Sequence, residues 1–272
     1  MDIRLIAMDL DGTTLQRDRC HFSPRLLAAL EKAHDRGVVI APVTGRQFGL
    51  LPPVLGQEHT WKDLALLCNG GQIRKLNTGE MLFGLEISAA ALRQMLALAE
   101  EFHLPIEFSV DSTLHLTQSA FEQQLPWPEL TFHREIILAN HGRIVPSMEP
   151  LCACGIEKVN LLCVPPELRQ TLEERLEHVA VSAVWATPSC LEITHPDATK
   201  GNGLQRLCEI VGVPMSAVMA LGDSGNDITM LQQAGLGVAM GNAPDFVKAA
   251  ADLCAPRYDE DGAAKVIEQY IL

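Results

Sequence analysis

The chain has 272 residues, of which 47% are apolar and 20% are charged, a balance typical of a globular protein with a sizeable core. The 21 Lys and Arg residues against 34 Asp and Glu residues leave a net charge of −13, which argues against a general affinity for nucleic acid or for an anionic membrane. No apolar run approaches the roughly 20 residues that span a bilayer, and no basic segment followed by an apolar one opens the sequence, so we expect a cytoplasmic protein.

Residues 3–8 predict a buried strand that ends in a reactive loop. The run Ile-Arg-Leu-Ile-Ala-Met shows no alternation of apolar and polar residues, which indicates a central parallel strand covered on both faces. Asp9 and Asp11 follow directly and enter a turn at Gly12. Ligands of open α/β sheets bind at the carboxyl ends of the strands, so we expect chemistry at these two carboxylates. The plainer alternative is a polar turn without a function.

Two more segments repeat the pattern of a strand that ends in a polar glycine turn. Residues 23–36 predict a helix that begins with a Ser N-cap and a Pro. The strand predicted at 38–43 then runs into Thr44-Gly45-Arg46, and the strand predicted at 63–68 runs into Asn69-Gly70-Gly71. Three such units with helical stretches between them predict an α/β fold with a doubly wound, Rossmann-like parallel sheet.

The pattern changes between residues 85 and 186. A long amphipathic helix is predicted at 88–103. Segments typical of strands lie at 106–110, 156–163 and 179–184. Mixed α+β segments between two α/β regions predict an inserted domain, because the loops of an existing fold tolerate insertions. We therefore expect a core domain of residues 1–84 and 187–272 and an inserted α+β domain of residues 85–186.

The last third returns to strands that end in turns. A helix is predicted from the glycine-rich start at Lys200 to about Val211. The strand predicted at 218–221 runs directly into Gly222-Asp-Ser-Gly-Asn-Asp227, a second acidic glycine turn, and a further helix and a buried strand follow. The sequence thus delivers a second pair of carboxylates to the end of a strand.

Four motifs resemble, in order, those of the haloacid dehalogenase superfamily. They are Asp9-Leu-Asp-Gly-Thr13, Thr44-Gly-Arg46, Lys200-Gly201 and Gly222-Asp-Ser-Gly-Asn-Asp227. One D-x-D pair would be a weak signal, whereas four motifs at strand ends in this order are specific. The place of the inserted domain, the Asn69-Gly70 turn and the segment 238–242 resemble the Cof-type phosphatases, whose inserted domain is a C2 cap. The resemblance implies a magnesium-dependent phosphoric monoester hydrolase.

The two acidic turns carry groups suited to the hydrolysis of a phosphate monoester. A carboxylate that attacks phosphorus splits the reaction into two easier steps through an aspartyl phosphate, a role that we assign to Asp9. A Mg2+ ion would neutralise the repulsion between nucleophile and substrate, with Asp9 and Asp223 as its natural ligands. In the resembled family, the residue at the position of Asp11 binds the metal through its backbone carbonyl, which leaves its carboxyl free for proton transfer. Asp11 must then be protonated at the start, and Asp227 supports the site as a metal ligand through water.

The phosphate group itself needs hydrogen-bond donors and positive charge. Thr44 offers a hydroxyl, and the backbone N–H groups of Leu10 and Gly45 would face an anion in turns of this kind. Lys200 brings a compact positive charge to the start of its helix. Asn226 resembles the position whose amide contacts phosphate in the family. Further candidates for contact with the substrate are Arg46, Asn69 and Gly70.

Each assignment has a plainer alternative. Asp223 and Asp227 could merely cap the helix that follows them, although a capping role does not exclude metal binding. Lys200 could be a solvated lysine, and Arg46 could pair with an acid instead of the substrate. Three histidines are candidates for metal ligands or acids, but they lack the spacing of a metal motif. We interpret them as structural or surface residues: His103, His115 and His195. Asp197, in the turn before Lys200, has no interpretation from the sequence.

The favoured function is a magnesium-dependent phosphatase that acts on a small phosphorylated metabolite. Sugar phosphates are the first candidates by resemblance, followed by pyridoxal phosphate and nucleotides. Candidates for substrate contacts in the inserted domain, chosen by position alone, are Glu107, Ser109, Lys158 and Asn160. Two alternatives stay open, a phosphomutase of the same superfamily and a non-enzymatic phosphoacceptor module like the receiver domains. Receiver domains lack a second Asp two residues after the acceptor and lack a large inserted domain.

Overall fold

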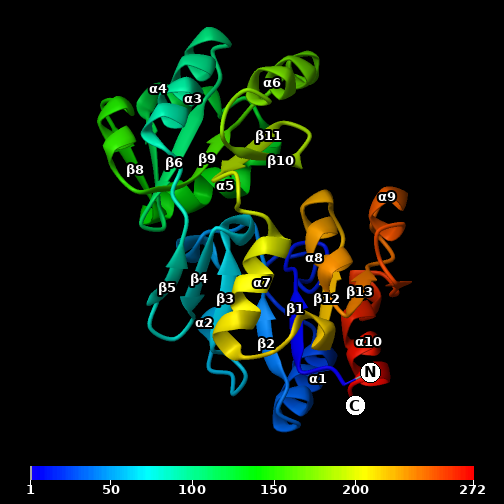
Figure 1. Cartoon of the computed structure of the whole chain (residues 1–272). Helices are drawn as coiled ribbons and strands as arrows, with labels where there is room; N and C mark the ends of the chain where they lie inside the picture. The colour runs from blue at the N-terminus through cyan, green and yellow to red at the C-terminus, as the bar shows by residue number, and fades with distance from the viewer. Residues whose placement is uncertain (1) are drawn as a thin grey trace. The chain divides into compact units, whose positions relative to one another are not determined.

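The chain folds into two compact units (Figure 1). The computed structural model describes the backbone of residues 2–272 and all of their side chains except those of residues 129, 132, 136, 140 and 141. The first unit is Met1–Phe83 with Thr199–Leu272, and the second unit is Gly84–Ala198. The second unit runs past the end expected at residue 186, because its last strand, β11 (Cys190–Thr194), pairs antiparallel with two other strands of that unit.

The first unit is built on a parallel sheet of five strands in the order β14-β13-β12-β1-β2. These strands are β1 (Leu5–Met8), β2 (Val39–Pro42), β12 (Val218–Gly222), β13 (Leu236–Ala239) and β14 (Leu253–Cys254). All four residues of β1 are buried, as the unbroken apolar run predicts. The predicted parallel α/β sheet is therefore confirmed, and its central strands β1 and β12 are those that lead into the two acidic turns.

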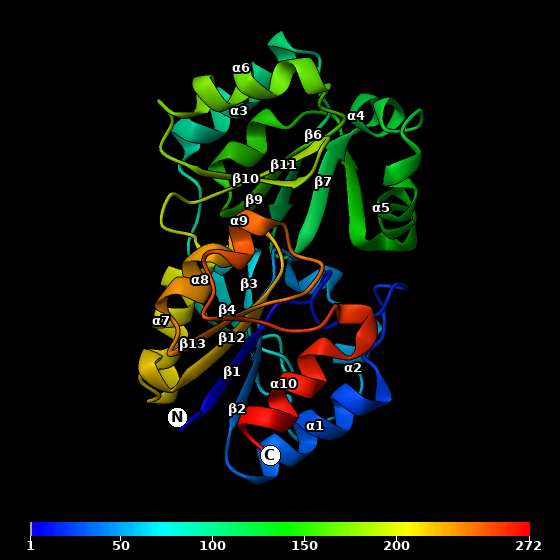
Figure 2. The ribbon, with the colours of Figure 1, turned by 90° about the vertical axis from the view of Figure 1, so that its right-hand side faces the viewer.

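Helices cover both faces of this sheet. The helices of the first unit are α1 (Pro24–Asp35), α2 (Pro53–Gly56), α7 (Lys200–Val211), α8 (Ile228–Gln233), α9 (Asp245–Lys248) and α10 (Gly262–Tyr270). Helices α1 and α10 lie side by side (Figure 2) and pack with Ile6 and Met8 of β1. Helices α7 and α8 pack with Leu5 and Ala7, whose side chains point to the opposite face. Burial of each large apolar side chain contributes about 2 kcal/mol, so packing on both faces stabilises β1 inside the core.

The predicted third strand belongs to a different sheet. A three-stranded sheet contains β3 (Leu64–Leu67), β4 (Gln72–Lys75) and β5 (Met81–Gly84), and β3 pairs antiparallel with β4. The positive φ angles of Asn69 (56°) and Gly70 (102°) turn the chain back into this hairpin. Leu66 still forms an isolated parallel bridge with Val43, and the Leu66 carbonyl accepts a hydrogen bond from the Thr44 amide over 2.9 Å. The ends of β2 and β3 therefore lie together as expected, although β3 does not extend the parallel sheet with a full ladder.

The second unit is an α+β domain on a six-stranded sheet of order β10-β11-β9-β6-β7-β8. Its remaining strands are β6 (Ile106–Val110), β7 (Thr113–Thr117), β8 (Gly142–Val145), β9 (Ile156–Leu161) and β10 (Ser182–Thr187). Its helices are α3 (Ala89–Glu101), α4 (Gln118–Gln123), α5 (Thr131–Ile136) and α6 (Arg169–Leu176). Apolar residues on one face of the sheet, such as Phe108 and Val159, pack with residues of α3 and α6. The α+β character expected for the inserted segment is thus observed.

The other face of this sheet carries a buried carboxylate, Glu107. It accepts hydrogen bonds from Gln124 (3.0 Å), from the His133 ring (2.8 Å) and from Asn160 (3.3 Å). Burial alone would raise the pKa of Glu107, but the charge and hydrogen bond of His133 lower it overall. Burial likewise opposes the charged form of His133, yet Glu107 raises the pKa of this imidazole overall. The pair therefore fastens α5, which carries His133, to β6.

Loss of the positive charge at position 133 should destabilise the protein in a pH-dependent way. We expect His133→Gln to cost about 2 kcal/mol near pH 6, because a charged hydrogen bond to a buried carboxylate is lost. The folded pKa of His133 lies above its unfolded value, so the pair stabilises below about pH 6.5 and loses this contribution as the pH rises through the folded pKa. Urea unfolding at pH 6 and pH 9 measures the difference, which should shrink at pH 9.

His115→Gln is the matched control for this prediction. His115 contacts the backbone carbonyl of Thr113 over 3.0 Å rather than a carboxylate. The groups that face His133 besides Glu107 are Lys158 and Glu192, whose opposite charges largely offset one another. An equal cost of His133→Gln at both pH values would contradict the ion-pair interpretation.

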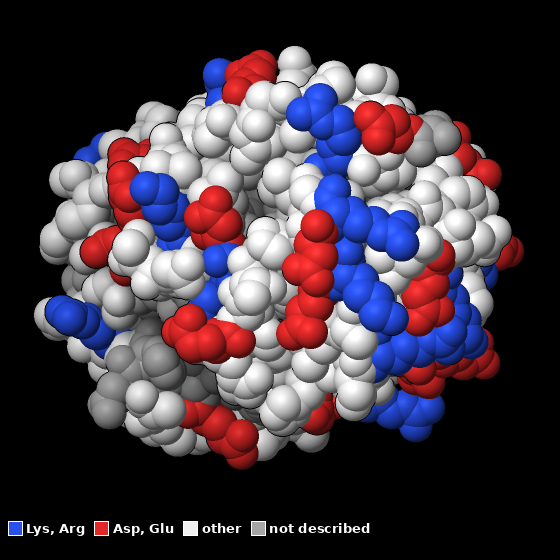
Figure 3. Space-filling view, turned by 90° about the horizontal axis from the view of Figure 1, so that it is seen from below, with Lys and Arg blue, Asp and Glu red and all other residues white. Residues whose placement is uncertain are grey.

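Charges of both signs are interspersed on the surface drawn in Figure 3, where Lys and Arg side chains lie next to Asp and Glu side chains. Exposed ion pairs of this kind include Arg25 with Glu268 at 2.6 Å and Arg175 with Glu101 at 2.8 Å. Such pairs contribute little stability in water, typically below about 1 kcal/mol. Within the described part of the chain, the helices are too short or too polar to cross a bilayer.

Candidate active site

The loop after β1 closes tightly around the carbonyl groups of its first two residues. The Leu10 carbonyl accepts hydrogen bonds from the amides of Thr14 (3.0 Å) and Leu15 (2.9 Å), and the Thr14 hydroxyl donates to the Asp9 carbonyl over 2.6 Å. Gly12 has a φ of +80°, and a Cβ at this position would overlap the Asp223 carboxylate. The turn therefore needs glycine both for its backbone conformation and for the approach of Asp223.

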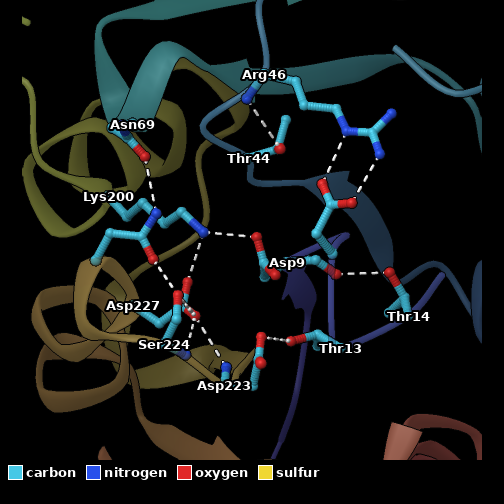
Figure 4. A network of polar contacts seen from close by, with 12 residues as sticks. Asp9, Thr13, Thr14, Thr44, Arg46, Asn69, Lys200, Asp223, Ser224 and Asp227 are labelled. Carbon is cyan, nitrogen blue, oxygen red and sulfur yellow. Dashed lines mark hydrogen bonds and ion pairs between the residues drawn. The ribbon is translucent and has the colours of Figure 1, made fainter. Parts of the chain in front are cut away.

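Three carboxylates converge beside this loop (Figure 4). One oxygen of each of Asp9, Asp223 and Asp227 lies within 4.8 Å of the others. The Lys200 ammonium, on the first turn of α7, lies 2.6 Å from Asp9 Oδ1 and 2.5 Å from Asp227 Oδ1. Lys200 is only 1% exposed, so it is not the solvated lysine of the plainer alternative. Lys200 pairs with two of the three carboxylates, so the cluster keeps an excess of negative charge when all three are ionised.

Burial and mutual repulsion govern the protonation of this cluster. Burial, together with the charges of Asp227 and Asp223, raises the pKa of Asp9 even though Lys200 opposes the shift. Burial, with the charge of Asp227, raises the pKa of Asp223 to about 6. Burial alone would lower the pKa of Lys200, but Asp227 and Asp9 raise it overall, so the amine stays charged. A cluster that resists full ionisation is one that an added cation would stabilise.

The donor set of the cluster fits a hard divalent cation. Carboxylate oxygens are the ligands that Mg2+ prefers, and a charge of two would offset the excess negative charge. Asp227 uses its other oxygen to accept hydrogen bonds from the amides of Asp223 and Ser224, both at 2.9 Å, and it forms a capping box with Ser224. Asp227 therefore takes part in capping the helical turn and also belongs to the carboxylate cluster, a combination that the sequence did not exclude.

The Asp11 carboxylate does not join this cluster. It pairs with the Arg46 guanidinium through two hydrogen bonds, 2.8 Å from Nε and 2.7 Å from Nη2. Arg46 also donates to the Leu50 carbonyl over 3.2 Å, and the Asp11 side chain is 36% exposed. The sequence leads us to expect a protonated acid at position 11, whereas the structure places a cation in contact with it. The sequence left two roles open for Arg46, contact with the substrate or an ion pair with an acid, and the structure shows the ion pair.

The other predicted site residues lie in loops that hydrogen bonds tie together. The Thr44 hydroxyl accepts from the Arg46 amide over 3.1 Å, and the Thr44 carbonyl accepts from the Asn69 amide over 3.1 Å. The Asn226 side chain donates to Asn69 Oδ1 over 2.9 Å and accepts from the Ser224 hydroxyl over 2.6 Å. These contacts join the ends of β2, β3 and β12.

Gly70, in the turn after β3, lies close to the start of α7. A Cβ at Gly70 would overlap the carbonyl of Thr199, the N-cap residue of the helix that starts at Lys200.

The two predicted backbone donors lie in the loops after β1 and β2. Leu10 lies between Asp9 and Asp11 and is fully buried, and Gly45 lies between Thr44 and Arg46. The loops of the first unit thus carry the core-motif residues, with the Asp11 carboxylate paired with Arg46 and outside the carboxylate cluster.

Two residues of this site are missing from the sequence-based assignment. The Thr13 hydroxyl donates to Asp223 Oδ1 over 2.9 Å, and the Asn242 amide donates to Asp223 Oδ2 over 3.1 Å. A hydroxyl directly after the acidic turn is a signal that points to Thr13. Asn242 follows the strand β13 in a Gly-Asn turn, so the rule that polar residues at strand ends form the site would have included it.

The three histidines considered as ligands belong to the second unit, whereas the carboxylate cluster belongs to the first. His195 Nδ1 accepts a hydrogen bond from the Asp197 amide over 3.1 Å, and its carbonyl accepts one from Ala198 over 2.8 Å. Asp197 therefore occupies a local turn that the His195 side chain stabilises. This turn accounts for both residues structurally.

The sequence profile of the haloacid dehalogenase-like hydrolases matches residues 6–267. The chain is 29% identical over 283 residues to the pyridoxal phosphate phosphatase YbhA of Escherichia coli (strain K12), covering 100% of both chains. It is 29% identical over 276 residues to the 5-amino-6-(5-phospho-D-ribitylamino)uracil phosphatase YcsE of Bacillus subtilis (strain 168), covering 100% of this chain and 97% of that protein. Among solved structures, the subclass IIB sugar phosphatase BT4131 superposes with a TM-score of 0.82 at 25% identity, covering 98% of each chain.

The chain belongs to the family of haloacid dehalogenase-like hydrolases. The predicted Cof-type branch and the class of phosphoric monoester hydrolases are confirmed by these similarities. The match extends through both units, so the second unit corresponds to the cap domain of these relatives. Membership of an enzyme family removes the support for a non-enzymatic, receiver-like module.

Proposed function

We propose that this protein is a Mg2+-dependent phosphatase that hydrolyses a small organophosphate through an aspartyl phosphate on Asp9. The observation that carries the proposal is the convergence of Asp9, Asp223 and Asp227, whose carboxylate oxygens lie within 4.8 Å of one another. The Lys200 ammonium contacts Asp9 and Asp227. A bound Mg2+ ion would lower the repulsion between the carboxylate and the phosphate dianion. Asp9, Asp223 and Asp227 would hold it, with the Asp11 backbone carbonyl assigned by resemblance.

In the first step, a carboxylate oxygen of Asp9 forms a bond to phosphorus while the ester P–O bond breaks. Asp11 gives its proton to the leaving oxygen, so the alcohol departs neutral. In the second step, water attacks the phosphorus of the aspartyl phosphate, Asp11 takes up its proton, and inorganic phosphate and free Asp9 are restored. Because the Asp11 carboxylate pairs with Arg46 in this structure, we propose that Arg46 holds this carboxylate in place between the two steps, after Asp11 has given its proton to the leaving oxygen and before it takes one from water.

Fixed positive charge and hydrogen-bond donors stabilise the transferring phosphoryl group in this proposal. Lys200 supplies the charge, and its two carboxylate contacts hold the ammonium in one position. Thr44, Asn226 and the backbone amides of Leu10 and Gly45 supply neutral donors. Since the charge of the transition state is spread over three oxygens, removal of one donor typically costs on the order of a hundredfold in rate.

Hydrolysis of para-nitrophenyl phosphate tests this function. We expect release of inorganic phosphate with Mg2+ and none above background with EDTA, and we expect the activity to return when Mg2+ is added back. Equal rates with and without EDTA would contradict the role of a metal. Transfer of the phosphoryl group to an added sugar phosphate, without release of inorganic phosphate, would favour a phosphomutase.

We propose a sugar phosphate as the substrate, on the basis of the polar face of the second unit's sheet. The register of the strands pairs Glu107 with Asn160 and Ser109 with Lys158, so these four candidates share one face. Charges on this face occur as pairs, Glu107 with His133 and Lys158 with Glu192. All four side chains are buried and their charges are paired within the second unit, so this face favours an uncharged sugar over a group with a further phosphate. The similarity to a sugar phosphatase supports the same choice.

Specificity constants for a panel of phosphorylated metabolites test the substrate proposal. We expect kcat/KM to be at least about tenfold higher for hexose and pentose phosphates than for nucleoside monophosphates, since a pair of well-placed hydrogen bonds is worth roughly that factor. Pyridoxal phosphate is the informative competitor because one relative is a pyridoxal phosphate phosphatase. A clear preference for pyridoxal phosphate or nucleotides would overturn the sugar assignment and leave the phosphatase proposal intact.

The leaving group reveals whether Asp11 acts as the acid. We expect Asp11→Asn to lower kcat/KM for alkyl phosphates by about a hundredfold, because a poor leaving group needs a proton. The loss should be about tenfold for para-nitrophenyl phosphate, whose leaving group departs without one. Equal losses for the two substrates would contradict the acid role in the first step. Asp18→Asn, at an exposed aspartate of the same unit that pairs with His21, is the control and should change neither rate.

A further inference from the structure

Asp223 has a neutral hydrogen-bond donor on each of its two carboxylate oxygens. Thr13 donates to Oδ1 over 2.9 Å, and Asn242 donates to Oδ2 over 3.1 Å. A carboxylate oxygen has two lone pairs, so each oxygen keeps capacity for a cation after accepting one hydrogen bond. Neutral donors fix the orientation of the carboxylate without adding a positive charge that would compete with a metal ion.

The Asn242 amide is held in one orientation by three different segments. Its Nδ2 group donates to Asp223 and also, over 2.9 Å, to the carbonyl of Gly12 in the first acidic turn. Its Oδ1 atom accepts from the backbone amide of Tyr258 over 3.2 Å. An amide flip would place an acceptor against two other acceptors, so the contact with the Tyr258 amide and the two donations all favour the same orientation.

The backbone that carries Asn242 is also constrained. The Met240 amide donates to the Gly222 carbonyl over 2.9 Å, which joins the end of β13 to the start of the second acidic turn. A Cβ at Gly241 would lie 2.9 Å from the amide nitrogen of Arg257, so glycine is needed for the close approach of the C-terminal segment. Asn242 is therefore presented to the two acidic turns by packed backbone on both sides.

We propose that Asn242 is a positioning residue for the metal site, which orients Asp223 and holds the two acidic turns at a fixed separation. This inference rests on the proposed function, since it assigns a role at the same site. Groups that orient metal ligands from behind typically contribute 10- to 100-fold in metal affinity. Asn242 is expected to act in this way while making no contact with the metal or the substrate.

Direct metal binding tests the role of Asn242. Mn2+ is the probe, because its binding to the full-length protein can be followed by electron paramagnetic resonance without turnover. We expect Asn242→Ala to weaken Mn2+ binding at least tenfold, because the Asp223 carboxylate then loses one of the two donors that orient it. The Mg2+ concentration that gives half-maximal hydrolysis of para-nitrophenyl phosphate should rise by a similar factor, with a smaller change in the rate at saturating Mg2+.

Asn77→Ala is the matched control. Asn77 also donates its side-chain amide to a backbone carbonyl, that of Lys62 at 3.0 Å, but it lies in the turn between β4 and β5. This variant should lose a comparable amount of stability and keep the Mn2+ affinity of the unmodified protein. If Asn242→Ala does not fold, Asn242→Ser provides the same test with a shorter polar side chain.

The outcomes separate this inference from the function on which it rests. Mn2+ binding by the unmodified protein, together with Asn242 variants that fold and bind Mn2+ within twofold of it, would overturn the positioning role alone. An unmodified protein that binds no Mn2+ and hydrolyses no phosphate ester would overturn the proposed function. Weakened binding in the Asn242 variants but not in Asn77→Ala would support the positioning role.

Discussion

Replacing Asp9 by Asn is expected to lower the rate of phosphate release by more than about a thousandfold, because removal of a catalytic nucleophile leaves only the contribution of the surrounding binding groups. An amide has nearly the same shape as a carboxylate, so the loop after β1 should keep its hydrogen bonds to the backbone of Asp9 and Leu10. The variant should therefore fold like the unmodified protein. It should also respond to Mg2+, since Asp223 and Asp227 are unchanged.

Phosphate release checks the loss of activity, circular dichroism checks the fold, and urea unfolding with and without Mg2+ checks the response to the metal. Asp252→Asn is the control, because Asp252 is exposed and only accepts a hydrogen bond from the Gly237 amide over 2.8 Å in the same unit. We expect the control to retain nearly full activity. An Asp9→Asn protein that kept a tenth of the activity would show that the bond to phosphorus forms elsewhere.

Strand β1, which leads into Asp9, could be predicted because its own residues determine its buried position. An unbroken apolar run indicates burial on both faces, and packing against α1 and α10 on one side and α7 and α8 on the other provides it. The start of α1 is equally local, since the Ser23 hydroxyl accepts from the Leu26 amide over 3.1 Å and Pro24 occupies the first turn. Structural features that depend on residues close together in the chain could therefore be predicted from the sequence.

The course of β3 could not be read in the same way. A glycine turn after a strand is compatible with a helical crossover or with a hairpin, and the left-handed backbone of Asn69 and Gly70 decides for the hairpin. The sequence supplies residues that tolerate this conformation without requiring it. The predicted parallel neighbour of β2 is consequently reduced to the bridge between Val43 and Leu66.

The partners of the charged site residues depend on contacts across long stretches of chain. Asp11 and Arg46 are 35 residues apart, and Asn242 is 230 residues from the Gly12 carbonyl that it contacts. The four motifs placed the candidates at strand ends, and that placement holds in the first unit. Which carboxylate would pair with Arg46, and which would join Lys200, depended on side-chain directions within the turns that residue types do not specify.

Removal of the buried ammonium at position 200 should damage both stability and catalysis. Lys200 is 1% exposed and offsets the charge of Asp9 and Asp227, so Lys200→Met leaves two buried carboxylates without their cation. We expect a loss of about 3 kcal/mol or more in the free energy of unfolding in EDTA at pH 7.5, the usual cost of breaking a buried ion pair from one side. Phosphate release should fall on the order of a thousandfold, since the charge opposite the transferring group is lost as well.

Urea unfolding and phosphate release of Lys200→Met and Lys75→Met, measured side by side, separate this buried pair from an ordinary one. Lys75 pairs with Glu80 at 2.7 Å, but its side chain is 41% exposed, so its loss should cost well below about 1 kcal/mol and leave the activity unchanged. Mg2+ should narrow the stability gap between Lys200→Met and the unmodified protein, because a cation bound by the same carboxylates replaces part of the missing positive charge. If the two lysine variants were equally stable in EDTA, the ammonium would not be what holds the cluster together, and the argument that its excess negative charge calls for a metal would lose its basis.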